Sequence, residues 1–305
     1  MKRIGMLVSV LALFVLGSCG QTPPAGGGNG GGGTTPVVEP QDVAEVLGAA
    51  ETQLYRLEAP LAQAGVPVPV LQFGPFSGGI APLDTATWNC DPVNVTGDAS
   101  DPDRDGVPAN ATYNGRCTWS YSGDQGSVEG YWEYRNVNVQ DPDSNDPQAG
   151  VKVKGEVEWG VTVSGQGSVT FTWTITQHDL VKQGSGYSFH YKGTWTVDVP
   201  DETEDLVFNY DLSGTWTPDD LNEPWGNGTL SASGSFNGDG PGCDQGWSME
   251  AKLTGIHYNG DKIDGGRAEY SGTDCDGQSA EVVVTWLPDT VCVSFDNHSV
   301  CFPND

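Results

Sequence analysis

The chain has 305 residues and is strongly acidic, with 41 acidic against 13 basic side chains and a formal net charge of −28. This excess of negative charge repels phosphate backbones and anionic headgroups, so we expect no nucleic-acid partner. The acidity also suits a surface exposed to divalent cations, although a need for solubility alone would explain it.

The first predicted element is an export signal. A basic start precedes an apolar stretch over residues 6–16, which is too short to cross a bilayer as a stable helix. The sequence Leu16-Gly17-Ser18-Cys19 then resembles the lipobox of bacterial lipoproteins. The resemblance implies a signal peptide over residues 1–18, acylation of Cys19 and contact with a membrane through that anchor. The alternative is an ordinary secretory signal with a chance cysteine.

The residues after Cys19 indicate where the protein resides. Gly20 replaces the aspartate that, in the lipoprotein sorting rule, would retain the protein at the inner membrane. We therefore expect a bacterial cell-envelope protein at the outer membrane or cell surface. Residues 26–35 are almost entirely glycine, asparagine and threonine, a composition that cannot bury enough surface to fold. Residues 19–40 are thus expected to form a flexible tether, followed by a single β-domain over residues 41–305.

One amphipathic helix is expected at the start of this domain, over residues 42–59. Apolar residues recur there at spacings of three and four, from Val43 to Leu57. Asp42 and Glu45 have the spacing of a capping box, and Pro60 marks the end. A single apolar stripe predicts that this helix packs against another element.

From about residue 82 onward the pattern changes to strict alternation, which predicts antiparallel strands with one apolar face. The stretch 151–164, for example, has valines, a glycine and a tryptophan at odd positions and mainly charged or polar residues at even positions. We expect about twelve strands joined by short connections, so that sequence neighbours pair in an up-and-down meander. They are expected at residues 83–90, 111–122, 127–140, 150–164, 168–178, 186–199, 204–217, 226–237, 247–258, 262–273, 278–287 and 290–296.

Glycines recur inside these strands on the apolar face. Because a glycine weakens a strand unless the sheet bends there or another group approaches closely, a row of them predicts a crease. We therefore expect an all-β fold with a strongly curved sheet or a closed barrel. The glycines concerned are Gly155, Gly193, Gly214, Gly234 and Gly255.

The seven cysteines fit an oxidising compartment, since six remain once Cys19 is acylated. In a meander, alternate connections lie at the same end of the sheet, which brings the loops of Cys243 and Cys275 together. Cys90 and Cys117 flank the long loop 91–110, and Cys292 and Cys301 lie near the C-terminus. We expect these three pairs to be disulfides, among the fifteen pairings that six cysteines allow.

Because alternate connections of a meander lie at the same end of the sheet, two aspartate-rich loops, 91–110 and 141–149, are expected at one end. Carboxylates at alternate positions before a glycine resemble the first half of an EF-hand or thrombospondin-type calcium loop, although Thr112 stands where an EF-hand has its glutamate. The resemblance implies a Ca²⁺ site, against the alternative of plain solvated turns. Its expected ligands are Asp98, Asp101, Asp103, Asp105 and the carbonyl of Val107, with Asp141, Asp143 and Asn145.

A second metal site is conceivable at His178 and His190, which flank the expected loop 179–185 and would share the polar face. Surface histidines without any such role are the commoner case.

No motif of known catalytic chemistry occurs, neither H-E-x-x-H nor G-x-S-x-G nor a phosphate or dinucleotide loop. We therefore expect a protein that is not an enzyme but a structural or binding module. Two alternatives stay open: a carrier of a lipid or other apolar ligand inside the curved sheet, and an outer-membrane barrel. The sequence does not identify a protein partner.

Overall fold

The computed structural model describes the strands of the domain and part of the chain before them. Its described residues are 49–50, 53–54, 56–57, 60–61, 63–64, 87–91, 93–123, 126–164, 167–198, 205–240, 242–243, 246–260, 262–295 and 298–304. The expected signal peptide, Cys19 and the glycine-rich tether lie outside these residues.

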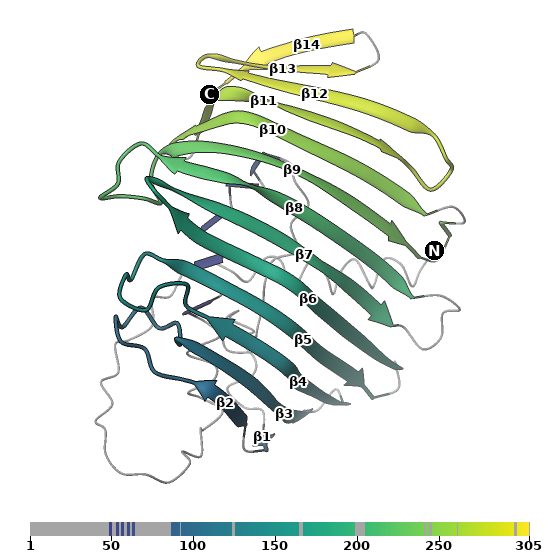
Figure 1. The fold of residues 1–305 in the computed structure, drawn as a ribbon. Coiled ribbons are helices and arrows are strands. Elements are labelled where there is room, and N and C mark those ends of the chain that lie inside the picture. Colours follow the sequence, from purple (N-terminus) through teal and green to yellow (C-terminus); the bar gives the residue numbers. More distant parts are fainter. Residues whose placement is uncertain are drawn as a thin grey trace.

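The described chain forms one antiparallel sheet of 14 strands (Figure 1). From β3 onward each strand pairs with the next one along the chain, and β1 and β2 both pair with β3. The strands are β1 (Thr87–Cys90), β2 (Asn94–Asp98), β3 (Asn110–Gly123), β4 (Gly126–Gln140), β5 (Gly150–Val163), β6 (Gly167–Gln183), β7 (Gly186–Asp198), β8 (Leu206–Pro218), β9 (Gly228–Asp239), β10 (Trp247–Asn259), β11 (Lys262–Thr273), β12 (Ser279–Leu287), β13 (Thr290–Phe295) and β14 (His298–Pro303).

The expected meander is confirmed, and each expected strand corresponds to one in the structure. The sequence pattern missed β2, which lies inside the expected loop 91–110, and β14 at the C-terminus. Strand β6 is also longer than expected, since it continues to Gln183 and leaves only a two-residue turn before β7. Short strands such as β2 escape an analysis based on alternation because they contain too few repeats.

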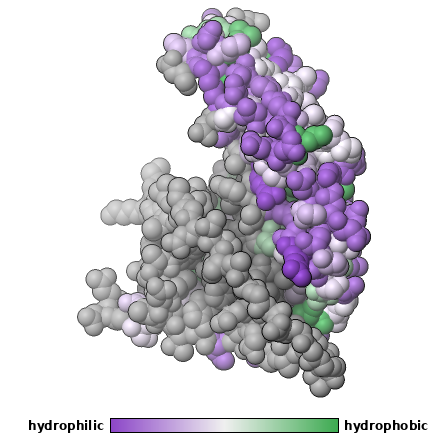
Figure 2. All heavy atoms as spheres, turned by 90° about the vertical axis from the view of Figure 1, so that its left-hand side faces the viewer, coloured by the Kyte–Doolittle hydropathy of each residue, from purple (hydrophilic) through white to green (hydrophobic). Residues whose placement is uncertain are grey.

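The sheet is open. Its strand order runs from β1 and β2 at one edge to β14 at the other, and no pairing joins these edges among the described residues. The sheet bends into an arc whose convex side is mainly hydrophilic (Figure 2). Strong curvature is therefore present, whereas the described strands do not close into a barrel.

The two faces of the sheet separate apolar from polar side chains, because residues along a strand point alternately to opposite sides. In β5 the valines at 151, 153 and 157 are buried, and exposure rises at the positions between them. Large buried side chains include Trp173 and Trp216, and burying each such ring stabilises the fold by roughly 1.5–3 kcal/mol.

The strand glycines have two different structural roles. Gly155 and Gly255 have positive φ of 133° and 57° and lie at irregularities of the β5–β6 and β9–β10 pairing. Gly193 instead makes room for a cross-strand neighbour, since an added Cβ would lie 2.4 Å from the Tyr210 hydroxyl and 2.5 Å from the Thr174 carbonyl. Bulges and close ring packing thus replace the single crease that was expected.

The expected helix over residues 42–59 lies largely outside the described residues. The described positions among residues 49–63 are helical, and Leu54, Leu57 and Leu61 are fully buried in the core cluster. The hydroxyl of Tyr258 on β10 donates a hydrogen bond to the carbonyl of Pro60, and that of Tyr270 on β11 donates to the carbonyl of Ala64. This part of the chain therefore contacts the apolar face.

Among the described residues, no helix has the length and apolar character needed to cross a bilayer.

Two of the three expected disulfides are confirmed among the described side chains. Cys243 and Cys275 join the β9–β10 and β11–β12 connections with a Cα–Cα distance of 4.7 Å, and Cys292–Cys301 joins β13 to β14. Cys90 lies directly opposite Cys117 in the β1–β3 register, as the third expected bridge requires.

Replacing Gly193 with alanine should destabilise the fold, because the new Cβ would collide with a backbone carbonyl as well as a buried ring. We expect the free energy of unfolding to fall by about 2–3 kcal/mol in urea titrations followed by tryptophan fluorescence. Gly265→Ala is the matched control, since its Cβ would meet only the His257 side chain at 3.7 Å. Equal stability of the two variants would contradict this account of Gly193.

Candidate metal centre

The two aspartate-rich loops lie side by side at one end of the sheet. One connects β2 to β3 over residues 99–109, and the other connects β4 to β5 over residues 141–149. The backbone N–H of Asp141 donates a hydrogen bond of 2.9 Å to the carbonyl of Pro108. A direct contact therefore confirms that these loops share one end.

The loop between β2 and β3 folds around the side chain of Asp101. Its Oδ1 accepts a hydrogen bond of 2.8 Å from the N–H of Arg104, and its Oδ2 accepts one of 3.0 Å from the N–H of Gly106. Both residues have left-handed backbones, with φ of 65° and 90°. An added Cβ at Gly106 would lie 2.7 Å from the Cβ of Ala49, so glycine suits both the turn and its neighbour.

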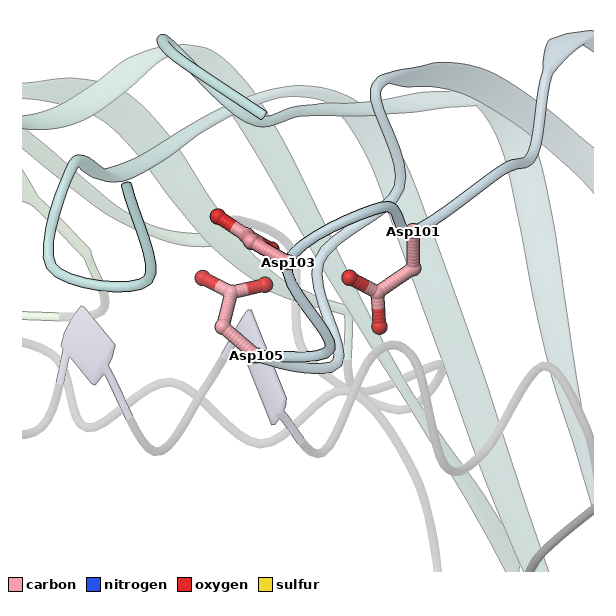
Figure 3. Close-up of side chains that lie close together, drawn as sticks. All are labelled: Asp101, Asp103 and Asp105. Atoms are coloured by element: carbon pink, nitrogen blue, oxygen red, sulfur yellow. The ribbon is translucent and has the colours of Figure 1, made fainter. Parts of the chain in front are cut away.

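This turn gathers three carboxylates, those of Asp101, Asp103 and Asp105 (Figure 3). One oxygen of each lies within 4.8 Å of the others. Since Ca²⁺ binds oxygen at about 2.3–2.6 Å, two oxygens on opposite sides of one ion are about 5 Å apart. All three carboxylates are therefore close enough to share one cation.

A fourth carboxylate, that of Asp141, approaches this cluster from the neighbouring loop. Asp141 is only 4% exposed, and its Oδ2 is buried without a hydrogen-bond partner. Burial, and then the charges of Asp105 and Asp103, raises the pKa of Asp141 to about 6, against the opposing effect of the Asp143 N–H. A buried carboxylate with only one of its oxygens hydrogen-bonded is costly, and the other oxygen is available to a cation.

Asp103 is in a similar position. Both of its carboxylate oxygens are buried, and neither accepts a hydrogen bond of ordinary geometry. Burial and the charge of Asp105 raise the pKa of Asp103, and burial likewise raises the pKa of Asp105. Neighbouring carboxylates therefore oppose one another's ionisation at neutral pH, and a divalent cation among them would reverse that effect.

The other expected ligands, Asp98, Asp143, Asn145 and the carbonyl of Val107, stay predictions, and the structure shows the local hydrogen bonds around them. Asp98 is exposed, and its carboxylate accepts hydrogen bonds from the backbone and hydroxyl of the serine two positions on. Asp143 accepts a hydrogen bond of 3.2 Å from the N–H of Asn145, which forms a local turn. Val107 is fully buried, and its N–H donates to Asp105 Oδ1 at 2.7 Å.

One residue at the site was missed by the sequence analysis. Gln53 Nε2 donates a hydrogen bond of 2.8 Å to Asp105 Oδ2, which links the chain before the sheet to the aspartate-rich turn. No local pattern distinguishes this glutamine, since its partner lies 52 residues further along the chain.

The expected pairing of His178 with His190 on the polar face is wrong. An irregularity between Ile175 and Gln177, where β6 pairs with β7, shifts the alternation by one residue. His178 is therefore fully buried in the core, whereas His190 is half-buried on the other face, 2.8 Å from Asp211. Rings on opposite faces of a sheet cannot bind one metal ion together.

His178 instead belongs to a hydrogen-bonded group inside the core. The Tyr210 hydroxyl accepts a hydrogen bond of 2.6 Å from Trp173 Nε1 and lies 2.7 Å from His178 Nε2. That hydroxyl therefore donates to Nε2 and leaves the imidazole proton on Nδ1, a buried atom without a hydrogen-bond partner. Burial lowers the pKa of His178 to about 3, so the ring is neutral.

The aromatic side chains of the apolar face, which an apolar ligand inside the curved sheet would contact, pack against one another. Trp159 stacks on Trp132 and Phe171 at centroid distances of 5.1 and 4.8 Å, and it meets Trp195 edge-on at 5.4 Å. A groove of about 750 Å³ also lies on the sheet across β5 to β10, lined both by polar side chains such as Asp179 and by apolar ones such as Val181 and Leu253. These contacts give the rings a packing role.

Comparison with known protein families, curated protein sequences and solved structures finds no match to this chain. Its function is therefore argued from the chemistry of the site, because a fold alone does not determine a function.

His178 should make the protein sensitive to acid. The unfolded ring takes up a proton near pH 6.5, whereas burial lowers the folded pKa to about 3, so stability is lost as the pH falls below 6.5. In urea titrations from pH 6.5 to 4.5, wild type should lose about 2 kcal/mol more stability than His178→Phe. His190→Phe is the control and should follow wild type. Parallel curves for wild type and His178→Phe would show that the ring is not held neutral.

Proposed function

We propose that this protein is a lipid-anchored, non-catalytic module of a bacterial cell envelope that binds Ca²⁺ as a structural ion at one end of its sheet. The observation that carries the proposal is the buried, unpartnered oxygen of Asp141, a carboxyl group that interacts electrostatically with Asp103 and Asp105 of the three-carboxylate cluster. Without a cation, folding has to bring these like charges together. With one, the same groups become ligands.

The chemistry of the donor set favours Ca²⁺ over other ions. All four proposed ligands are carboxylates, Asp101, Asp103, Asp105 and Asp141, and hard oxygen donors select Ca²⁺ or Mg²⁺ rather than zinc or copper. Ca²⁺ accepts six to eight oxygens in flexible geometry, whereas Mg²⁺ demands an octahedron and gives up water reluctantly. A cluster drawn from two loops suits the more adaptable ion.

The proposed ion would join three parts of the chain. Asp101, Asp103 and Asp105 belong to the β2–β3 loop, and Asp141 begins the β4–β5 loop. Asp105 also accepts the hydrogen bond of Gln53, so the turn that holds the ion would fix the amphipathic helix proposed for residues 42–59. Binding there would stabilise the covering of the apolar face without any reaction.

Calcium should raise the melting temperature of the protein, and this rise should depend on Asp141. At a concentration 100 times the dissociation constant, a bound ion contributes about 2.7 kcal/mol, or roughly 5–10 °C for a chain of this size. Mg²⁺ at the same concentration should give a smaller rise. Differential scanning fluorimetry of the chain with Cys19→Ser, in Ca²⁺, Mg²⁺ or EDTA, measures both.

Asp141→Asn separates a ligand from a merely structural residue. In EDTA this variant should be more stable than wild type by roughly 1–3 kcal/mol, because it removes a buried charge. In Ca²⁺ it should lose the rise that wild type shows. Asp143→Asn is the matched control and should respond to Ca²⁺ like wild type. The proposed site would be refuted if Ca²⁺ left the melting temperature of wild type unchanged. It would also be refuted if Ca²⁺ still raised the melting temperature of Asp141→Asn.

The anchor is tested separately from the ion. Acylation of Cys19 should place the protein in the membrane fraction, and Cys19→Ala should release it into the soluble fraction after cell breakage. Gly20→Ala is the control and should remain anchored, since it preserves the acylated residue. Fractionation with immunoblotting measures both, and a Cys19→Ala variant that stays with the membrane would argue against a lipid anchor.

A further inference from the structure

The last strand, β14, leaves one edge of the sheet open. It pairs with β13 on one side and is the end of the strand order among the described residues. All six of its residues are exposed, including Val300 at 54% and Phe302 at 53%. Such an edge offers unpaired backbone groups to another strand.

The register of the β13–β14 pair shows which backbone groups are unpaired. Cys292 and Cys301 lie opposite each other with a Cα–Cα distance of 4.1 Å, the short spacing of a pair that exchanges no hydrogen bonds. The N–H of Asn304 donates a hydrogen bond to the carbonyl of Asp289, three positions from this pair. Because hydrogen-bonded and non-hydrogen-bonded pairs alternate along the strands, this bond also indicates that Cys292 and Cys301 exchange no backbone hydrogen bonds. The backbone groups of Ser299 and Cys301 therefore point away from β13.

The devices that normally protect an edge strand are missing along most of β14. Neither Thr290–Phe295 nor His298–Pro303 contains a lysine, arginine, aspartate or glutamate, although the whole chain has a net charge of −28. The pairing of β13 with β14 is regular, and Pro303 is at the end of the strand. Charges, prolines and bulges normally prevent an edge strand from pairing with another chain, so this edge is open to pairing.

The occupant that this edge fits is a second copy of the chain. An antiparallel pair of identical strands is related by a two-fold axis, so the same edge serves both partners. The uncharged strands of this hairpin are also where two such acidic molecules can meet with least repulsion between facing side chains. The Cys292–Cys301 disulfide holds the hairpin together beforehand, which lowers the entropy lost on association.

We propose that two copies of the chain pair through β14, antiparallel, with Val300 facing Val300 of the second copy across the axis. In this register Ser299 of each copy faces Cys301 of the other, and the two pairs exchange four backbone hydrogen bonds. Phe302 faces His298 on the same side as Val300. The two sheets become one continuous sheet, independent of the proposed ion at the far side of the domain.

A cysteine at the axis tests the register. Val300→Cys places two thiols opposite each other in a pair without hydrogen bonds, the geometry that already holds Cys292 and Cys301 together. In the chain with Cys19→Ser, mild oxidation should give a covalent dimer on a non-reducing denaturing gel. Leu221→Cys is the matched control, 57% exposed but in the β8–β9 connection, and should stay monomeric.

A charge at the axis tests the association itself. Sedimentation equilibrium of the same chain, over about 1–100 μM, should show a dimer with a dissociation constant on the order of micromolar. Val300→Lys puts two ammonium groups opposite each other and should weaken association at least about tenfold, whereas Val300→Thr should preserve it. Circular dichroism verifies that the exposed substitutions leave the fold intact.

The proposal is overturned if wild type is a monomer throughout this range, or if it forms a dimer that Val300→Lys leaves unchanged. It is also overturned if Val300→Cys cross-links no faster than Leu221→Cys. None of these outcomes bears on the metal site, because Val300 and Asp141 are on elements at opposite ends of the strand order.

Discussion

The rest of the structure depends on the pairing of each strand with the next one along the chain. Because neighbouring strands run antiparallel, every second connection returns to the same end of the sheet, and loops distant in sequence become neighbours. This constraint brings Asp141 to the turn of Asp101, Asp103 and Asp105 and joins Cys243 to Cys275. It also divides the side chains between an apolar face and a convex polar one. The site is thus a product of strand order, and no separate structural unit is needed to build it.

Strand positions and disulfide partners could be predicted from the sequence because both follow from local alternation and from counting connections. What could not be predicted is where the alternation changes phase. The irregularity after Ile175 turns His178 into the core, although the surrounding residues give no sign of it. The role of Gly193 was hidden for a related reason. Its neighbour Tyr210 lies on the next strand, and the contact between them exists only in one register.

The candidate metal centre, too, could be predicted from the sequence only in part. The alternate aspartates and the glycine after them are visible in the sequence, as is the shared end of the two loops. The burial of Asp141 is not visible, because it depends on how closely the β4–β5 loop approaches Pro108. Nor is the hydrogen bond from Gln53, a residue far away along the chain. Sequence reasoning found the charges, while packing decides which of them are deprived of water, and the proposed cation site depends on that burial.

The two tyrosine hydroxyls that bind the carbonyls of Pro60 and Ala64 have a consequence for the order of folding. Nearly all other pairing is between consecutive hairpins, so contacts of short sequence separation can form as soon as each hairpin exists. The carbonyls of Pro60 and Ala64, by contrast, find their donors only after residues 258 and 270 have been synthesised. The leading segment must therefore wait for the trailing strands. During that interval the apolar face is uncovered, so the period before the last strands form is when the chain is most prone to aggregate.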